Sequence, residues 1–273
     1  MQQFSVAPKE MLNSLWRNRS LIKALVKRDV VGRYRGSILG LAWSFFNPIL
    51  MLIIYTIVFS GVFKARWDPS VHAGNTDFAI ILFVGLIVHG LFAECINRAP
   101  SLIVSNANYV KKVIFPLEIL PWVAFGSALF HTLISFGVLL LAKLILNHHV
   151  PLTALLFPLV LLPLILGTIG LTWALAALGV YLRDIAQMTT MFTTIMLFLS
   201  AVFFPISAMP EKYQFWLQIN PLAIIIQEAR KVLVIDQPPD FFILTLLLFI
   251  GAGIAWAGFA CFQSTRKGFA DVL

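Results

Sequence analysis

Six stretches of this chain contain no Asp, Glu, Lys or Arg, and most of them are as long as a membrane-spanning helix. About 20 apolar residues are needed to cross a hydrocarbon core of roughly 30 Å. The stretches predict six spans, near residues 36–63, 78–93, 119–142, 153–180, 185–210 and 241–265. Charged residues make up only 12% of the chain, about half the share in a soluble domain. We therefore expect an all-α membrane protein, with residues 1–273 forming one membrane domain.

Two further segments are predicted to be helical without crossing. Residues 11–31 carry apolar side chains at helical spacing with basic residues between them, which predicts an amphipathic interface helix within residues 1–35. Before the last span, the charge-free run 213–227 is too short to cross and is broken at Asn220-Pro221. Residues 203–232 are therefore expected to form a re-entrant helical hairpin.

Basic residues are distributed unevenly between the two sides of the predicted bundle. Six spans place both termini on one side, which carries fourteen Lys and Arg against five on the other, with Lys143 near the end of the third span. Cytoplasmic loops carry the excess of basic residues, so both termini are predicted to be cytoplasmic. The first ten residues lack the layout of a signal peptide, and no cleavage is expected.

The motifs of an energy source or a catalytic centre are missing. None of the 16 glycines is followed by Lys, so the sequence has no G-x-x-x-x-G-K phosphate loop, and it has no H-E-x-x-H or G-x-S-x-G. Cys95 and Cys261 are too few for a four-ligand metal site and are expected to be buried thiols. Glu94 is expected to pair with Arg98, one turn later, rather than to relay protons, and His131 to form a hydrogen bond between helices. The chain is predicted to form a path that another protein drives.

Three motifs carry a resemblance to a known family. The first is KRDVVGRYRGSILGLAW at residues 27–43, which leads into Phe46-Asn47-Pro48. The second is ECINRAP at 94–100, followed by Asn106 and by KKVIFP at 111–116; the third is Phe204-Pro205 with Pro210 and Asn220-Pro221. In this order, over nearly the whole chain, the motifs closely resemble the membrane subunits of bacterial ABC exporters of the O-antigen polysaccharide type. These are type-2 export permeases, and the capsule and teichoic-acid exporters share the layout.

The resemblance implies partners that composition does not reveal. It implies a homodimer of this chain docked on two copies of a separate ABC ATPase, which holds ATP and Mg, so no cofactor, metal or catalytic residue is expected here. It also implies a substrate, a glycan linked to polyprenyl pyrophosphate in the bacterial inner membrane, and no nucleic acid. Three alternatives stay open: a permease for capsule or teichoic-acid polymer, a permease for a small lipid or drug, and a membrane enzyme such as a polyprenyl-phosphate glycan transferase. An enzyme would need a cluster of carboxylates or His on one face, and the sequence shows none.

Two sets of polar residues are predicted to serve the carrier lipid and the ATPase. Guanidinium groups and a hydroxyl at the membrane boundary suit a pyrophosphate; an anchor on anionic lipid is the alternative. This carrier set is Arg28, Arg33, Tyr34 and Arg35. The resemblance favours loop 99–118 as the element that couples to the ATPase, and an ordinary basic loop is the alternative. This coupling set is Asn106, Tyr109, Lys111 and Lys112.

Aromatic residues are predicted to line the glycan path, because sugars stack their C–H faces on aromatic rings. The resemblance favours the first and fifth spans, although lipid contact at the membrane boundary is an alternative for such residues. The channel set is Trp43, Phe46, Tyr55, Phe59, Phe192 and Phe198. Hairpin 203–232 is expected to act as an outer gate, or else as a rigid plug, with the gate set Phe203, Phe204, Pro205, Asn220 and Pro221. Glu228, Arg230 and Lys231 are expected to pair across the dimer axis.

Overall fold

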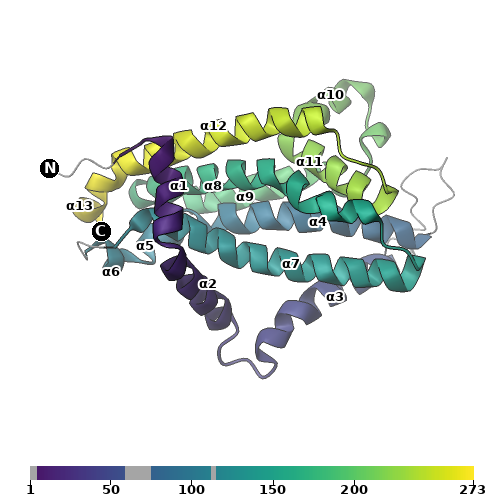
Figure 1. Ribbon diagram of the computed structural model, residues 1–273, viewed down its shortest axis with the longest axis horizontal. Coiled ribbons are helices and arrows are strands. Elements are labelled where there is room, and N and C mark those ends of the chain that lie inside the picture. The colour runs from purple at the N-terminus through teal and green to yellow at the C-terminus, as the bar shows by residue number, and fades with distance from the viewer. Residues whose placement is uncertain (1–4, 59–74, 112–114) are drawn as a thin grey trace.

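The computed structural model describes residues 5–58, 75–111 and 115–273, and these residues form an elongated bundle of helices (Figure 1). No β-strand occurs within the described ranges, and the all-α prediction is confirmed. Helix α1 and the C-terminus lie towards the same end of the bundle, which we call the terminal end; the opposite end is the far end.

Five helical segments are long and apolar enough to cross a membrane. They coincide with five of the six predicted spans, and each contains one long helix. The segments are Gly40–Val58 with α3 (Trp43–Tyr55), Phe78–Arg98 within α4 (Asn75–Arg98), Leu117–Asn147 with α7 (Leu120–Asn147), Leu152–Tyr181 with α8 (Phe157–Tyr181) and Phe241–Val272 with α12 (Phe241–Thr265). Between α7 and α8 the chain turns at His148, whose φ is +52°.

The predicted fifth span is shorter than expected. Its helix, α9 (Ile185–Leu199), has 15 residues, which rise about 22 Å and fall short of a hydrocarbon core of roughly 30 Å. The helix ends because Ala201 adopts a φ of +52°, a left-handed conformation that interrupts an α-helix. The described structure therefore has five long apolar segments and one shorter apolar helix.

The first span begins later than the predicted residue 36. Gly36 and Gly40 have φ values of +89° and +50°, which glycine adopts without steric cost, and they turn the chain between α2 and α3. Only 11% of the apolar stretch in this span is buried. Helix α3 lies on the outside of the bundle, against α7 and α4 (Figure 1).

Helix α4 forms the centre of the bundle and is the most buried span, with 78% of its apolar stretch buried. It packs against α7, α8, α9 and α11 (Pro221–Arg230). Beside it, α8 and α12 lie in backbone contact, since a Cβ added at Gly258 would collide with the carbonyl of Gly170. Small residues at such a crossing allow two apolar helices to approach closely.

Two helices replace the single one predicted over residues 11–31. Helix α1 (Pro8–Arg17) and α2 (Arg19–Arg33) meet at Asn18, whose side-chain amide donates to the Ser14 carbonyl at 2.9 Å. Both run crosswise to the long helices (Figure 1). Helix α2 packs on α7, where a Cβ at Gly126 would lie 2.6 Å from Val26. The membrane interface stays a prediction for this pair.

The remaining elements lie at the two ends of the bundle. At the far end, the 3-10 turn Ile206–Ala208 is followed by α10 (Glu211–Ile219), α11 and the π-helical turn Lys231–Ile235 (Figure 1). Helices α10 and α11 meet at Asn220, as the sequence predicts for a broken pair. At the terminal end, loop 99–118 contains α5 (Ser101–Val104), α6 (Ala107–Val110) and the 3-10 turn Leu117–Ile119. The turn Arg266–Gly268 and α13 (Phe269–Val272) end the chain.

Candidate functional site

Charged side chains tie the end of α2 to α4 and α7. Nη2 of Arg33 lies 2.6 Å from Oε1 of Glu94, and Nη1 of Arg33 lies 3.2 Å from Nδ1 of His131. One turn after Glu94, Nη2 of Arg98 donates to both carboxylate oxygens of Asp29, at 2.9 and 2.8 Å. Together with Tyr34 we call these residues the α2–α4 cluster, which consists of Asp29, Arg33, Tyr34, Glu94, Arg98 and His131.

In the cluster, the closer partner of Glu94 is Arg33 and not the predicted Arg98. The predicted partner, Arg98, lies 3.7 Å away and makes the weaker contact, because Asp29 already holds the other terminal nitrogen of its guanidinium. The prediction for His131 is confirmed, since the ring joins three elements. Its Nδ1 lies 3.2 Å from Oε2 of Glu94, and its Nε2 lies 3.1 Å from the hydroxyl of Tyr34.

The structure separates the predicted carrier set into three places. Arg33 and Tyr34 lie together in the α2–α4 cluster. Burial raises the pKa of the Tyr34 phenol above its ordinary value, although the charge of Arg33 acts in the opposite direction, so the hydroxyl stays protonated at neutral pH. Arg28 instead donates to the Tyr109 hydroxyl at 2.9 Å, and Arg35 is exposed.

The coupling set lies on a loop that is held against the bundle. The ring of Tyr109 stacks on Phe115, with centroids 4.2 Å apart and planes inclined by 11°. The side-chain amide of Asn106 donates to the Leu102 carbonyl of α5 at 2.8 Å. Lys111 is exposed. Lys112 lies outside the described residues. The hydrogen bond from Arg28 therefore joins a member of the predicted carrier set to a member of the predicted coupling set, and the sequence did not predict this contact.

A buried carboxylate, Glu118, holds the C-terminal part of loop 99–118 in place. Glu118 accepts from Arg266 at 2.6 Å and from the Ser14 hydroxyl at 3.1 Å, and Arg266 also donates to the Phe115 carbonyl at 3.1 Å. The indole of Trp173 donates to the Glu118 carbonyl at 3.0 Å. This Glu118 clamp, formed by Ser14, Glu118 and Arg266, fastens α1 and the end of α12 to the loop.

The channel set is carried by two helices that expose most of their apolar side chains. Trp43 and Phe46 are exposed on α3, Phe192 and Phe198 are exposed on α9, and Tyr55 is half-buried. Phe59 lies outside the described residues. Phe192 meets Phe92 of α4 at 6.3 Å between centroids, and Phe198 meets Phe203 of the gate set at 5.4 Å.

The gate set follows the end of α9, where the interrupted backbone needs hydrogen-bond donors. The Asn220 side chain donates to the Leu199 carbonyl and the Ser200 hydroxyl, at 3.0 and 3.1 Å, and accepts from the backbone nitrogen of Leu222. Pro221 opens α11, while Phe203, Phe204 and Pro205 are half-buried before the next turn. Asn220 thus caps both helix ends.

Arg230 of α11 also donates to backbone carbonyls at the break that follows α9. It is 2% exposed and donates to the carbonyls of Ile81, Ala201 and Val202 at 3.2, 2.9 and 2.9 Å. Glu228 is bound within the chain by Lys231 at 2.6 Å and by the backbone nitrogen of Asp240 at 2.8 Å. Pairing of Glu228, Arg230 and Lys231 across a dimer axis stays a prediction; within the chain, buried carbonyls at the interrupted helix bind the guanidinium of Arg230.

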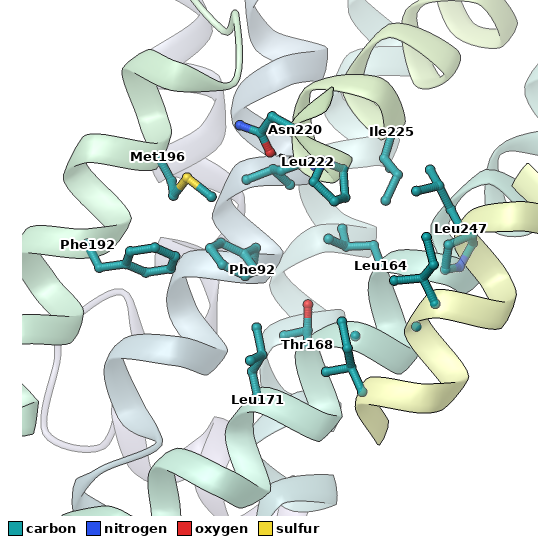
Figure 2. Close-up of a pocket in the computed structure, with 16 residues that line it drawn as sticks. Phe92, Leu164, Thr168, Leu171, Phe192, Met196, Asn220, Leu222, Ile225 and Leu247 are labelled. Atoms are coloured by element: carbon teal, nitrogen blue, oxygen red, sulfur yellow. Dashed lines mark hydrogen bonds between the residues drawn. The ribbon is translucent and has the colours of Figure 1, made fainter. Parts of the chain in front are cut away.

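An apolar cavity of about 150 Å³ lies beneath the Asn220-Pro221 break (Figure 2). Its walls come from α4, α8, α9, α11 and α12, and they include Phe92, Phe192 and Met196. The hydroxyl of Thr168 points into the cavity (Figure 2) and has no hydrogen-bond partner among the described residues. Asn220 and Pro221 therefore lie over a space that the neighbouring side chains do not fill.

Among the described residues, no three His, Cys, Asp or Glu side chains are grouped to hold a metal ion. Cys95 is a buried thiol, as predicted, and Cys261 is a partly buried one.

Comparisons with known proteins place the chain among transport proteins. The model of the family described as ABC-2 type transporter matches residues 20–234. The "O-antigen export system permease protein RfbA" of Myxococcus xanthus is 27% identical over 263 residues, which cover 96% of this chain and 98% of that protein. A protein of the same name from Klebsiella pneumoniae is 23% identical, covering 93% and 95%. The "Polysialic acid transport protein KpsM" of Escherichia coli is 25% identical, covering 77% and 80%.

Proposed function

This chain belongs to the ABC-2 type transporter family, and on that premise we propose that it is the membrane subunit of an ATP-driven exporter of O-antigen polysaccharide. As a family member it is an exporter permease and a multi-pass protein of the inner membrane. The observation that carries the O-antigen proposal is the likeness to permeases named for this export, which covers 96% of the chain.

The substrate that we propose is a glycan linked to polyprenyl pyrophosphate. A pyrophosphate entering from the membrane boundary needs donors and positive charge, and guanidinium groups supply both in a fixed geometry. Arg33 lies at the end of α2 beside Tyr34, and Arg28 lies earlier on the same helix. The terminal end of the bundle is therefore the proposed entrance.

A homodimer with the channel between its two copies is the proposed assembly. Helices α3 and α9 support it, because both expose apolar and aromatic side chains along most of their length. A second copy would cover part of these faces and leave the channel set, Trp43, Phe46, Tyr55, Phe192 and Phe198, around a shared path. The aromatic rings offer flat faces on which sugar units slide.

Two copies of an ABC ATPase are the proposed motor, and they hold ATP and Mg. Loop 99–118 is the proposed docking element, since it lies at the terminal end and exposes Lys111. A movement of this loop would be transmitted to α2 by the hydrogen bond between Arg28 and Tyr109. It would be transmitted to α1 and α12 by the Glu118 clamp. Docking at this loop requires both termini to be cytoplasmic, as the basic residues also predict.

The proposed sixth crossing combines α9 with the segment that continues it. Helix α9 is too short to cross by itself, and residues 200–210 continue the chain to α10 and α11 at the far end (Figure 1). Arg230 and Asn220 satisfy the carbonyls at the break, which makes an interrupted helix tolerable at membrane depth. The segment 203–232 is then a re-entrant gate.

Reconstitution tests the proposal directly. The chain and its ATPase are placed in vesicles loaded with polyprenyl-pyrophosphate-linked O-antigen, and the glycan that becomes accessible to an impermeant lectin is measured. We expect accessibility to increase with ATP only when the ATPase is present. Transport by the permease alone, or no transport by the complete complex, would contradict the proposal.

A capsule polymer is the second candidate substrate, because the relative named for polysialic acid transport aligns over 77% of this chain. The same vesicles distinguish the two candidates when they are loaded with lipid-linked polysialic acid. Faster transport of polysialic acid than of O-antigen would favour the second candidate.

A further inference from the structure

Glu94 lies between two guanidinium groups and an imidazole. Its Oε1 contacts Arg33 at 2.6 Å and lies 3.7 Å from Nη1 of Arg98, while its Oε2 lies 3.2 Å from His131. Side chains from α2 and α7 therefore lie within hydrogen-bond distance of one carboxylate, and a third from α4 lies just beyond it. An anionic phosphate would need the same kind of surroundings.

One terminal nitrogen of the Arg98 guanidinium could bind a second carboxylate. Its Nη2 holds both oxygens of Asp29. Its Nη1 is buried and makes no hydrogen bond within the described part of the chain, although Glu94 is 3.7 Å away on the same face of α4. A small rotation of the Glu94 side chain would bring it into hydrogen-bond distance of this nitrogen, because residues four apart on a helix are neighbours.

We propose that Glu94 is a two-position switch that occupies Arg33 in place of the carrier's phosphate and moves to Arg98 when the pyrophosphate binds. In the described structure Arg33 is neutralised by Glu94. When an anionic headgroup arrives, Arg33, His131 and Tyr34 turn to it, and Arg98 takes up the displaced carboxylate. The exchange keeps each charge paired, so no isolated charge is left at the membrane boundary.

The switch would also favour a pyrophosphate over a phospholipid headgroup at Arg33. Glu94 competes for the guanidinium, so a headgroup with one negative charge gains little from displacing it. A pyrophosphate carries more charge and more acceptor oxygens and displaces the carboxylate more readily. The ligand class assigned to this site is therefore a polyprenyl pyrophosphate rather than a phospholipid. This inference rests on the proposed carrier substrate.

The test measures binding of a fluorescent polyprenyl pyrophosphate to the full chain with its ATPase in nanodiscs without nucleotide. Polyprenol, which lacks phosphate, is the control probe, and polyprenyl monophosphate reports the preference for charge. We expect Glu94→Gln to tighten binding of the pyrophosphate about fivefold, the effect of removing one partly exposed competing pair. Arg33→Gln should abolish the advantage of pyrophosphate over polyprenol, and Glu94→Gln should not restore it in the double variant.

Arg98 separates a switch from a general effect of charge. If Glu94 moves to Arg98, then Arg98→Gln weakens pyrophosphate binding in the wild-type chain and has little effect in the Glu94→Gln background. If charges simply add, Arg98→Gln weakens binding equally in both backgrounds, and the switch is rejected. Glu94→Asp keeps the charge but shortens the reach, and it should tighten binding less than Glu94→Gln; size-exclusion chromatography confirms that each variant assembles.

The proposed carrier substrate and the switch fail in different ways. If the wild-type complex binds pyrophosphate, monophosphate and polyprenol equally and Arg33→Gln changes nothing, the carrier proposal is rejected together with the switch. If Arg33 is needed for pyrophosphate but Glu94→Gln leaves the affinity unchanged or weakens it, the carrier proposal stands and the switch alone is overturned.

Discussion

Arg266 and Glu118 form an ion pair of 2.6 Å, although 148 positions separate them in the chain. Their side chains are only 12% and 8% exposed, and removing one partner of such a buried pair leaves an uncompensated charge. We expect Arg266→Met to lower the free energy of unfolding by about 3 kcal/mol, measured by thermal or denaturant unfolding in nanodiscs.

The pair of Glu10 and Arg17 provides the control for this measurement. Its distance is 2.9 Å, but the two side chains are 29% and 61% exposed. Solvent screens such a pair, so Arg17→Met should cost less than about 1 kcal/mol. Equal effects of the two substitutions would show that burial does not set the strength of the Glu118 clamp.

Backbone contact between α8 and α12 gives a second prediction. A Cβ at Gly258 would collide with the Gly170 carbonyl, whereas one at Gly253 meets no atom within 4 Å among the described residues. Gly258→Ala should therefore destabilise the chain by about 2 kcal/mol through overpacking. Gly253→Ala, in the same helix, should stabilise it by up to about 1 kcal/mol through helix propensity. A melting temperature that changes in the same direction for both variants would argue against the contact.

Two threonines on α8 allow a matched test of the cavity. Both are buried, but Thr172 donates to the Thr168 carbonyl at 2.7 Å, and the Thr168 hydroxyl has no partner within the described ranges. Thr168→Val should leave thermal stability unchanged or raise it, while Thr172→Val should lower it by about 1 kcal/mol. A clear loss of stability in Thr168→Val would indicate that this hydroxyl is satisfied by something that enters the cavity.

Much of the helical bundle can be predicted from the absence of charge in long stretches. This absence places α4, α7, α8 and α12, because a long apolar helix is required wherever backbone groups must be satisfied in lipid. It does not reveal where an apolar helix stops: α9 ends at Leu199 because Ala201 adopts a left-handed φ. The same limitation affects the first span, where two glycines turn the chain before α3 begins.

Pairings between distant charges could not be predicted from spacing along the chain. Arg98 and Glu94 have the i,i+4 spacing of a helical ion pair, yet each has a closer partner from α2, Asp29 and Arg33 respectively. Asp29 and Arg33 lie in the basic segment 27–35, whereas Glu94 and Arg98 lie in the motif at 94–100, and the sequence does not state that α2 packs beside α4 at this point. Arg230 shows the same limit, because its partners are backbone carbonyls that only the folded chain brings together.

The hydrogen bond from Arg28 to Tyr109 leads to a prediction about coupling. It joins α2 to the loop proposed to dock the ATPase, at 2.9 Å, while the ring of Tyr109 stacks on Phe115. Tyr109→Phe keeps the stack and removes only the hydroxyl. Export in the reconstituted complex should slow about two- to fivefold, the value of one exposed charge-assisted hydrogen bond, while ATP hydrolysis and assembly with the ATPase continue.

Arg28→Gln should slow export similarly, and the double variant should be no slower than either single one. Tyr181→Phe is the control, because the Tyr181 hydroxyl donates to the Thr265 carbonyl at 2.9 Å and not to α2, and it should leave export unchanged. Fully additive effects of Arg28→Gln and Tyr109→Phe would show that the two side chains do not act through this hydrogen bond.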